Sequence, residues 1–244
     1  SAYITDITTI DDRARGMGRI GAAHGLGFIV GPAIGGLFAG FDPANLDLQL
    51  PFIIAAGLSA MAFALALFSV RETVSPETRD LAARHQRSPF RVFRGAIRVS
   101  QLALLLLLLT MTPFVFSAVE TTFVMWSERA LGWGPWRNGQ IYTFMGLIAA
   151  GTQWFLVGRL TQRFGERRLI QAGAVFIGVG VFILPFMAGP LGLCVAFSLI
   201  VFGVSINGPS INSLISRYAS PTERGSLLGV SSSCSALARI TGPA

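Results

Sequence analysis

Long apolar runs recur along the whole chain and leave little choice of fold. Six of them extend over residues 19–39, 51–70, 100–126, 138–157, 169–188 and 191–215, and a seventh begins near residue 226. A helix needs about 20 apolar residues to cross the ~30 Å hydrocarbon core of a bilayer. Because a backbone in lipid has no water to bond, its polar groups must be satisfied internally. The sequence therefore predicts an all-α integral membrane protein.

The charge distribution agrees with this class. The chain has 244 residues, of which 52% are hydrophobic and 13% charged, and its net charge is +7. Such a charge would suggest a nucleic-acid partner in a soluble protein. All nineteen basic residues are Arg, and if the helices alternate in direction, all but Arg129, Arg137 and Arg239 fall on one side of the membrane. This positive-inside pattern places the 71–98 connection in the cytoplasm and requires no nucleic acid.

No motif of a soluble enzyme is found in the sequence. Cys194 and Cys234 both lie in apolar spans, which indicates neither a disulfide nor a metal site. Gly25, Gly27 and Gly31 miss the spacing of the dinucleotide fingerprint and follow no predicted strand. There is no phosphate-binding loop, no Cys/His metal spacing and no Ser with a positioned base. We therefore expect no enzyme activity, no cofactor and no metal.

The stretch from Gly18 to Gly36 concentrates residues that disfavour a helix inside an apolar run. Gly27, Gly31 and Gly35 are spaced at i, i+4 and i+8, so they share one helix face without side chains. Faces of small residues let helices approach closely in lipid. Pro32 has no amide hydrogen and clashes with the preceding turn, which predicts a bend. We expect the glycine face to serve close packing between two halves of the protein.

An internal repeat organises the chain. A shift of 211 residues aligns Arg13 with Arg224, Gly18 with Gly229, and Gly31-Pro32-Ala33 with Gly242-Pro243-Ala244. Each copy follows a charged turn predicted to be cytoplasmic and points outward. Six helices lie between the two copies, so the repeat unit is six helices in parallel orientation, and two units make twelve, as in many secondary transporters.

These residues resemble the major facilitator superfamily, and within it the drug:proton antiporter group that includes the tetracycline efflux proteins. Every position of that group's glycine-rich antiporter signature is matched, by Gly18, Gly27, Gly31, Pro32, Gly35 and Gly36. The resemblance implies the major facilitator fold, with two parallel six-helix halves. By this resemblance the chain is an internal fragment with about seven helices, from the end of the fourth to the middle of the eleventh.

The resemblance also implies the domain boundaries. Residues 1–70 would end the N-terminal half, 71–98 would form the cytoplasmic central linker, and 99–244 would belong to the C-terminal half. The closing part of the linker, Phe90 to Ile97, has two readings. It is an amphipathic helix on anionic headgroups, where each Arg contributes about 1 kcal/mol, or it is a solvated tether with ordinary positive-inside charge.

A second motif occurs in the basic turn GRLTQRFGERR. This turn resembles the superfamily's loop signature between the eighth and ninth helices, with matches at Gly158, Arg163, Gly165, Arg167 and Arg168. Gln162 stands where the family usually has Asp. That departure puts a gating salt bridge at this loop in doubt.

Two charged residues fall inside predicted spans. Glu120 lies in the apolar segment before Trp126, where an ionised carboxylate is costly unless it is paired, protonated or hydrated. It is either a cavity-facing group that binds a proton or cation, or an interfacial carboxylate that reaches headgroup water. Arg239 lies near mid-membrane and needs a counter-charge or carbonyls. Glu120, an anionic substrate and an acidic residue elsewhere in the full protein are the open partners.

Neutral polar residues within the spans have functional and structural readings. His24 either titrates near neutral pH or is a hydrogen-bonded packing residue. Gln153, Asn207 and Asn212 either line a substrate path or form hydrogen bonds between helices.

The resemblance implies a secondary active transporter that exports a small, hydrophobic, drug-like compound in exchange for protons by alternating access, and so a role in antibiotic resistance. It would act as a monomer in the inner (plasma) membrane, with the small-molecule substrate, protons and lipid as its partners. Two alternatives stay open. One is a metabolite symporter or uniporter of the same fold, and the other is a transport-inactive membrane scaffold or receptor. The sequence does not name the substrate.

Overall fold

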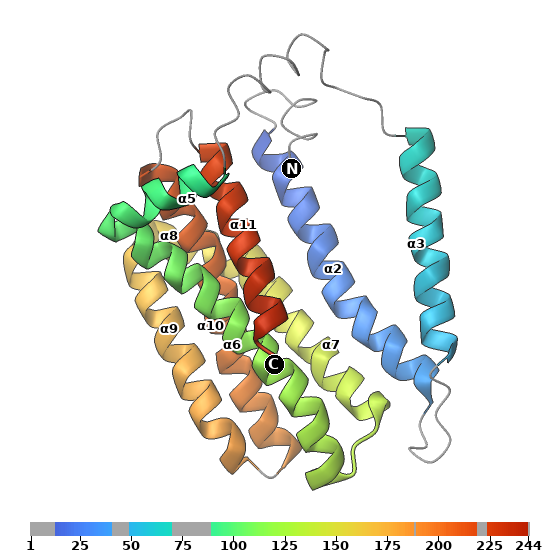
Figure 1. The fold of residues 1–244 in the computed structure, drawn as a ribbon. Coiled ribbons are helices and arrows are strands. Elements are labelled where there is room, and N and C mark those ends of the chain that lie inside the picture. Colours follow the sequence, from blue (N-terminus) through green and yellow to red (C-terminus); the bar gives the residue numbers. More distant parts are fainter. Residues whose placement is uncertain (1–12, 41–48, 70–88, 188, 219–223, 244) are drawn as a thin grey trace. The chain divides into compact units, whose positions relative to one another are not determined.

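The computed structural model describes residues 13–40, 49–69, 89–187, 189–218 and 224–243. Every regular element in these ranges is helical, which confirms the all-α prediction. The elements, shown in Figure 1, are α2 (Arg13–Ala39), α3 (Gln49–Ser69), α5 (Pro89–Arg98), α6 (Ser100–Leu131), α7 (Pro135–Gly151), the π-helical turn η1 (Thr152–Leu156), α8 (Val157–Phe164), α9 (Glu166–Ile183), the 3₁₀ turn η2 (Leu184–Phe186), α10 (Pro190–Tyr218) and α11 (Arg224–Thr241).

Five helical segments in the described ranges are long and apolar enough to cross a membrane. They are Gln49–Phe68, Ser100–Leu131, Pro135–Phe164, Glu166–Phe186 and Pro190–Ile215. The other two predicted spans also form helices, but α2 contributes a shorter apolar stretch, Gly25–Ala39, and α11 is not among the candidates. The serines and Arg239 of α11 lower its hydropathy. The structure therefore confirms a multi-pass membrane protein.

The chain forms two compact units. The first comprises residues 1–86 with Gly132–Gly146, and the second comprises Arg87–Leu131 with Leu147–Ala244. In the described ranges, α2, α3 and most of α7 belong to the first unit, and the remaining elements belong to the second. The predicted linker lies outside the described residues up to residue 88, and α5 forms its last part. The boundaries of two transporter halves stay a prediction.

Glycine contacts hold α9 against α10 in the second unit. A Cβ built on Gly180 would lie 2.9 Å from the carbonyl oxygen of Ala196 and 3.0 Å from the amide nitrogen of Ile200. A Cβ built on Gly203 would lie 2.6 Å from the carbonyl oxygen of Gly173. Side chains larger than hydrogen would separate these backbones. Because lipid offers no hydrophobic drive for helix association, such close backbone contact is what holds apolar helices together.

Helix α10 is the centre of the second unit. It packs against α6, α9 and α11, and several of its side chains are fully buried. Phe197 is completely inaccessible and meets Phe123 of α6 edge to face, with ring centroids 4.7 Å apart. A second apolar cluster joins α6, α9, α10 and α11 and consists of Leu102, Leu105, Leu106, Leu109, Ile170, Ile211, Ile215 and Leu227. The C-terminal helices are therefore ordered around α10.

Several hydroxyl groups in the apolar helices bond within their own helix. Thr112 donates a hydrogen bond of 2.9 Å to the carbonyl of Leu108, and Ser210 donates one of 2.7 Å to the carbonyl of Ile206. Each lies next to an in-helix proline, Pro113 in α6 and Pro209 in α10. Proline removes one backbone donor. A Ser or Thr hydroxyl that donates to the carbonyl four residues back often accompanies a bend in the helix.

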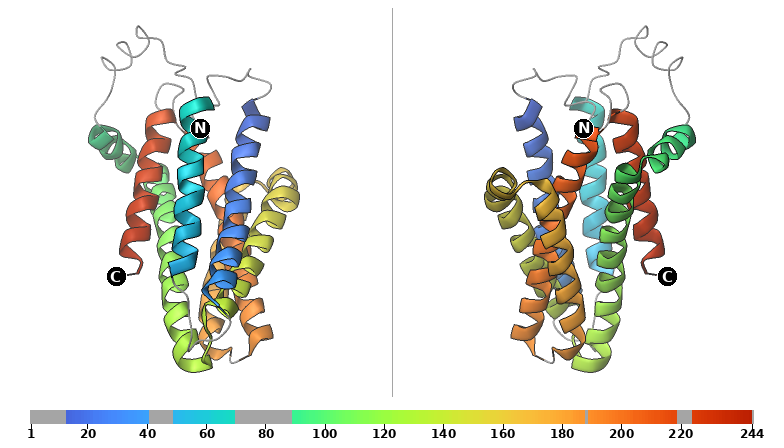
Figure 2. Two further views of the ribbon diagram at one scale, coloured as in Figure 1. Left: turned by 90° about the vertical axis from the view of Figure 1, so that its right-hand side faces the viewer. Right: turned by 90° about the vertical axis from the view of Figure 1, so that its left-hand side faces the viewer.

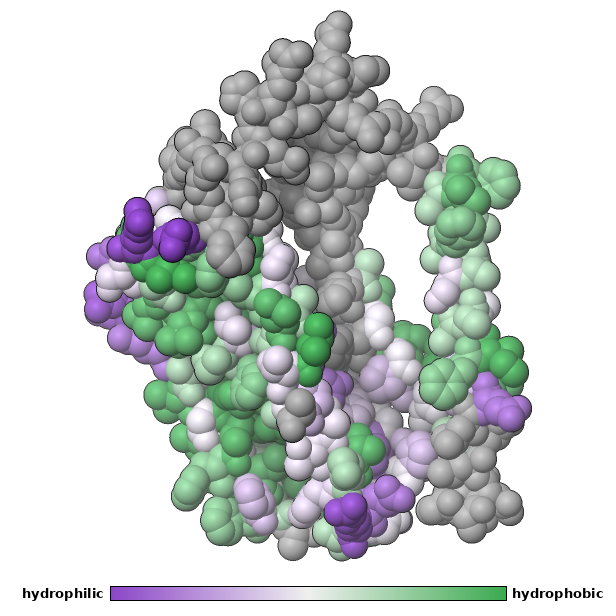
Figure 3. Space-filling view, viewed as in Figure 1, coloured by the Kyte–Doolittle hydropathy of each residue, from purple (hydrophilic) through white to green (hydrophobic). Residues whose placement is uncertain are grey.

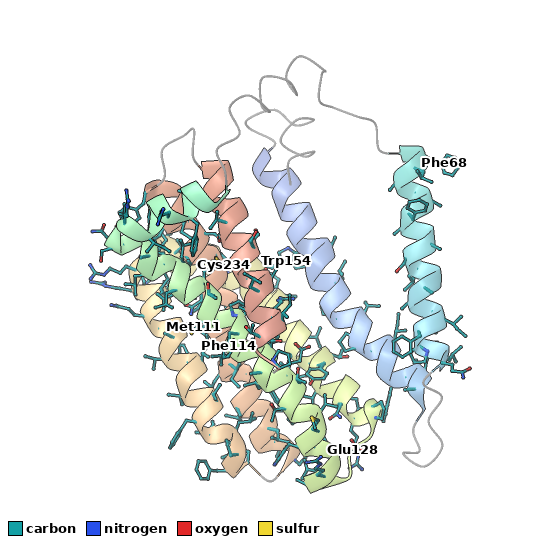
Figure 4. All side chains as sticks on the ribbon, viewed as in Figure 1. Phe68, Met111, Phe114, Glu128, Trp154 and Cys234 are labelled. Atoms are coloured by element: carbon teal, nitrogen blue, oxygen red, sulfur yellow. The ribbon has the colours of Figure 1, made fainter. Side chains whose placement is uncertain are left out.

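Large apolar side chains cover much of the outside of the described helices (Figure 3). On α3, Phe52, Phe63 and Phe68 are 75%, 66% and 89% exposed, and Phe68 points away from the helix in Figure 4. Water would penalise such a surface by about 25 cal/mol for each Å² of exposed apolar area. Lipid or further helices are the surroundings that it fits.

We predict that replacing Gly180 with Val destabilises the protein, whereas Gly178→Val on the same helix does not. The Cβ at position 180 meets the α10 backbone, while nothing lies within 4 Å of a Cβ built at position 178. Overpacking of this kind costs about 1–3 kcal/mol. Thermal unfolding of the full-length protein in detergent would measure the difference. Equal unfolding temperatures for the two variants would contradict the close contact.

Candidate functional site

The charged residues predicted inside spans lie on two helices that pack together, α6 and α11. The contact is close near the end of α11. A Cβ built on Gly242 would lie 2.7 Å from the carbonyl oxygen of Phe114 and 3.2 Å from Cβ of Ser117. Ser117 Oγ also donates a hydrogen bond of 3.2 Å to the carbonyl oxygen of Arg239. Figure 4 labels Phe114 at this part of α6.

Glu120 lies about one helical turn beyond Ser117 on α6. It is half-buried, and the charge of Arg239 acts on its carboxylate. An electrostatic interaction thus links the two residues that the sequence offered as partners on the basis of membrane depth alone, and their pairing stays a prediction. The Arg239 side chain itself is exposed in this chain. Its guanidinium is therefore also accessible to an anionic substrate or to another acidic residue, the two other partners that the sequence left open.

A second close contact joins α2 and α7 in the first unit. A Cβ built on Gly139 would lie 2.8 Å from the carbonyl oxygen of Pro32 and 3.0 Å from Cα of Gly36. In the other direction, a Cβ built on Gly36 would lie 3.0 Å from the carbonyl oxygen of Pro135. The backbones touch because both helices have glycine there. Sequence reasoning identified Gly36 as a motif position but missed Gly139, which forms the other side of the contact.

The expected packing face of α2 is open in this chain. Nothing lies within 4 Å of a Cβ built on Gly27, Gly31 or Gly35. The close contact falls instead to Gly36, which lies one position further along the helix. Pro32 lies inside the continuous helix α2 and does not interrupt it. The assignment of the Gly27, Gly31 and Gly35 face to packing between halves stays a prediction.

Gly18 and His24 are the other two candidate residues on α2, and the structure describes only their backbone. Gly18 lies within the helix, as the motif requires. His24 also belongs to α2, but its side chain lies outside the described residues. Its titrating and packing roles both remain open.

The neutral polar candidates separate into different environments. Asn207 is buried, with 2% of its surface exposed, and its Oδ1 contacts the position of a Cβ on Gly173 of α9. That oxygen has no hydrogen-bond partner among the described residues. Asn207 is therefore placed as a packing residue between α9 and α10. Gln153 and Asn212 are exposed, as a residue facing a substrate path would be.

Gln153 also belongs to an irregular helical turn that the sequence analysis did not predict. The turn η1 is π-helical, and the amide of Val157 bonds to the carbonyl of Thr152, five residues back. Such turns are rare and often occur at functional sites. The turn lies within the candidate span Pro135–Phe164.

The loop motif has a clear structural basis at Gly165. This residue ends α8 and precedes α9 with φ = 75°, a left-handed value that favours glycine. Its amide donates to the carbonyl of Thr161 and closes α8. The other matched positions, Gly158, Arg163, Arg167 and Arg168, are exposed. The motif therefore makes a tight turn that holds arginines outward.

Glu166 is a residue of this turn that sequence reasoning missed. It opens α9, is only 7% exposed, and accepts a hydrogen bond of 3.1 Å from Ser213 Oγ of α10. A carboxylate in the first turn of a helix is stabilised by the helix dipole. The available signal was that Glu166 is the one acidic residue in GRLTQRFGERR. Glu166 thus ties the turn to α10.

The described residues contain no group of three or more His, Cys, Asp or Glu side chains that could hold a metal ion. Cys194 and Cys234 are both free and half-buried. The chemistry that the described part offers consists of the charged pair on α6 and α11, exposed amides, and close backbone contacts between helices.

Membrane-length apolar helices joined by glycine contacts, with charges inside the spans, define a multi-pass membrane protein of the transporter type. A family model described as the Major Facilitator Superfamily matches residues 1–243. The chain belongs to this superfamily, whose members are transporters of small molecules rather than enzymes.

Curated relatives of the chain include efflux proteins. It is 28% identical over 246 residues to Multidrug resistance protein 2 of Bacillus subtilis (strain 168), with 100% of this chain and 60% of that protein covered. It is 32% identical over 244 residues to Tetracycline resistance protein, class D, of Salmonella ordonez, with 100% and 59% covered. The chain thus spans about 60% of the length of these relatives.

A solved structure supports the same fold. The crystal structure of the human organic anion transporter MFSD10 (TETRAN) matches with a TM-score of 0.66 at 22% sequence identity, and the match covers 99% of this chain and 59% of that one. At this identity the likeness concerns the fold alone. The helical architecture expected from the sequence is therefore shared with this solved structure.

We predict energetic coupling between Glu120 and Arg239. In a double-mutant cycle with Glu120→Gln and Arg239→Gln, the effects on the unfolding free energy of the full-length protein should deviate from additivity by about 0.5–3 kcal/mol, as for residues in contact. Glu128 provides the control, because it is exposed and lies two turns further along α6 (Figure 4). Its cycle with Arg239 should be additive. Additivity in both cycles would exclude the pairing.

Proposed function

We propose that the chain is part of a proton-coupled efflux transporter that exports a small hydrophobic compound by alternating access. The observation that carries this proposal is the placement of Glu120 beside Arg239 on adjoining helices. Ionisable residues within membrane spans are costly, and they mark ion or substrate pathways. A carboxylate that exchanges a proton is the simplest coupling group that the described residues offer.

Protonation of Glu120 would change the balance of forces between α6 and α11. The ionised carboxylate attracts Arg239, whereas the neutral acid does not. Loss of this attraction frees Arg239 for another partner and alters the preferred packing of the two helices. A proton can shift a conformational equilibrium only if it binds the two states with different affinity. The charge of Arg239 would supply that difference between states in which the pair is close and states in which it is apart.

The contact between α2 and α7 would provide a seal. It brings a helix of the predicted N-terminal half against a helix of the predicted C-terminal half, with glycine on both sides. Rocking of two halves around a midplane site is the general mechanism of transporters with such repeats. A contact of backbone on backbone would slide without side chains that interlock, and it would narrow the path for water and protons. This contact would prevent protons from crossing without an exchange for substrate.

The relatives and the motif support a lipophilic substrate. The chain carries the complete antiporter signature, and its relatives bear the names of multidrug and tetracycline resistance proteins. Exposed Gln153 and Asn212 would supply neutral hydrogen-bonding groups along the path of a lipophilic compound. The full protein would act in the inner membrane, as a monomer, with residues 71–98 in the cytoplasm.

We predict that an imposed proton gradient drives a lipophilic compound out of vesicles that contain the full-length protein. In a Glu120→Gln protein this dependence on the gradient should disappear, because residue 120 can no longer exchange a proton. A coupling free energy of about 1–3 kcal/mol corresponds to a change of about 5- to 150-fold. Glu128→Gln, which removes an exposed carboxylate from the same helix, should retain coupled transport. Fluorescence of tetracycline or a dye would report the flux.

The same assay separates the alternatives. Gradient-driven efflux that is unchanged in Glu120→Gln would contradict the assigned role of Glu120. Uptake with the gradient, or flux without it, would identify a symporter or a uniporter. Ligand binding without any ion-coupled flux would identify a membrane scaffold or receptor.

We further predict that Gly139→Val makes vesicles leak protons in the absence of substrate. The added side chain would push against the carbonyl of Pro32 and Cα of Gly36 and so hold α2 away from α7. Gly151→Val is the matched control on α7, because nothing lies within 4 Å of a Cβ at that position. A pH-sensitive dye inside the vesicles measures the leak. If vesicles with the Gly139→Val protein leak no more protons than those with the unaltered protein, the contact between α2 and α7 does not act as a seal.

A further inference from the structure

Helix α5 differs from the spans around it, because it is short, strongly amphipathic and turned away from the helix that follows. It ends at Arg98, the chain bends at Val99, and α6 begins at Ser100. Figures 1 and 2 show α5 running off to the side at the end of α6. Helix α5 packs against α6 and α11. The proposed transport mechanism assigns no task to this helix.

The described side chains of α5 present charge and apolar surface side by side. Arg94 and Arg98 are four residues apart, so they share one face of the helix, and both are exposed. Within the described part of the chain, neither guanidinium makes a hydrogen bond or an ion pair. Ile97 lies next to Arg98 and is 49% exposed, while Phe93 is half-buried. The outer surface of α5 therefore combines two exposed cations with an exposed apolar side chain.

The position of α5 along the spans places it at a membrane boundary. Arg98 lies two residues before the candidate span Ser100–Leu131. In the same unit, exposed Arg163, Arg167 and Arg168 flank the turn at Gly165, where one candidate span ends and the next begins. Hydrophilic side chains gather at the end of this unit where α5 lies, while much of its side is hydrophobic (Figure 3). The arginines of α5 thus lie at the same end of the unit as those of the turn between α8 and α9 (Figure 1).

We propose that α5 lies in the cytoplasmic headgroup layer and binds anionic phospholipid through Arg94 and Arg98, with Ile97 set into the boundary of the acyl chains. Charge complementarity selects anionic headgroups, since each Arg near such a surface contributes favourably. The apolar side chain favours a membrane over a soluble anion, because amphipathic interfacial helices bury their apolar face at the acyl boundary. Arginine stems can lie along lipid while the guanidinium reaches the phosphate.

The test uses the full-length protein in vesicles of phosphatidylcholine mixed with phosphatidylglycerol. After extraction, native mass spectrometry identifies the lipids that remain bound. The variant is Arg94→Gln with Arg98→Gln. The matched control is Arg129→Gln with Arg137→Gln, which removes the same charge from exposed residues at the far end of α6 and the start of α7. We expect the α5 variant to lose about 30-fold in its preference for phosphatidylglycerol, the factor that corresponds to about 1 kcal/mol for each Arg, and the control to retain it.

A second readout locates the helix without relying on bound lipid. A fluorophore on Ile97→Cys, with Cys194 and Cys234 replaced by Ala, should be quenched by a quencher attached to lipid and little by iodide in water. Strong quenching by iodide alone would overturn the proposal, as would equal lipid loss in variant and control. Displacement of the bound lipid by inorganic phosphate would show a site for small anions instead. None of these measurements depends on transport, so they stand or fall separately from the proposed function.

Discussion

The lack of water in the bilayer governs how these helices are built and joined. The backbone polar groups in a span must find their partners inside the protein, and the side-chain hydroxyls of Thr112 and Ser210 also bond within their own helices. Helix association cannot rely on a hydrophobic drive in lipid. It relies on close approach, which Gly180 and Gly203 permit between α9 and α10. The same device recurs between α2 and α7 and at the end of α11.

The same lack of water makes charged residues inside the spans candidates for a functional role. A charged group among apolar helices persists only when it is paired, hydrated or functional. Glu120 and Arg239 interact electrostatically, on helices that approach closely at Gly242 and Ser117. The glycine contact and the charged pair are therefore parts of one arrangement. Helix α11 is held near enough to α6 for the state of Glu120 to matter.

Sequence reasoning succeeded where periodicity and composition carry the information. The helices, their order and the turn at Gly165 could be predicted, and the family was recognisable from the antiporter signature. It was less informative about which residue of a pattern makes a contact. Gly36, and not Gly31, meets α7, and Asn207 is buried whereas Asn212 is exposed. Residues five positions apart on a helix point about 140° apart, and only the neighbouring helix decides which of them it meets.

The sequence by itself determined that this chain is a multi-pass helical membrane protein of the Major Facilitator Superfamily, because lengths of apolar runs, arginine asymmetry and motif spacing are properties of the chain alone. The tertiary structure decided the contacts between helices: Gly36 with Gly139, Gly242 with Phe114, and Glu166 with Ser213. These pairs join residues far apart in the sequence. Their geometry depends on how helices pack, which follows from shape complementarity between surfaces and leaves no regular pattern in either helix alone.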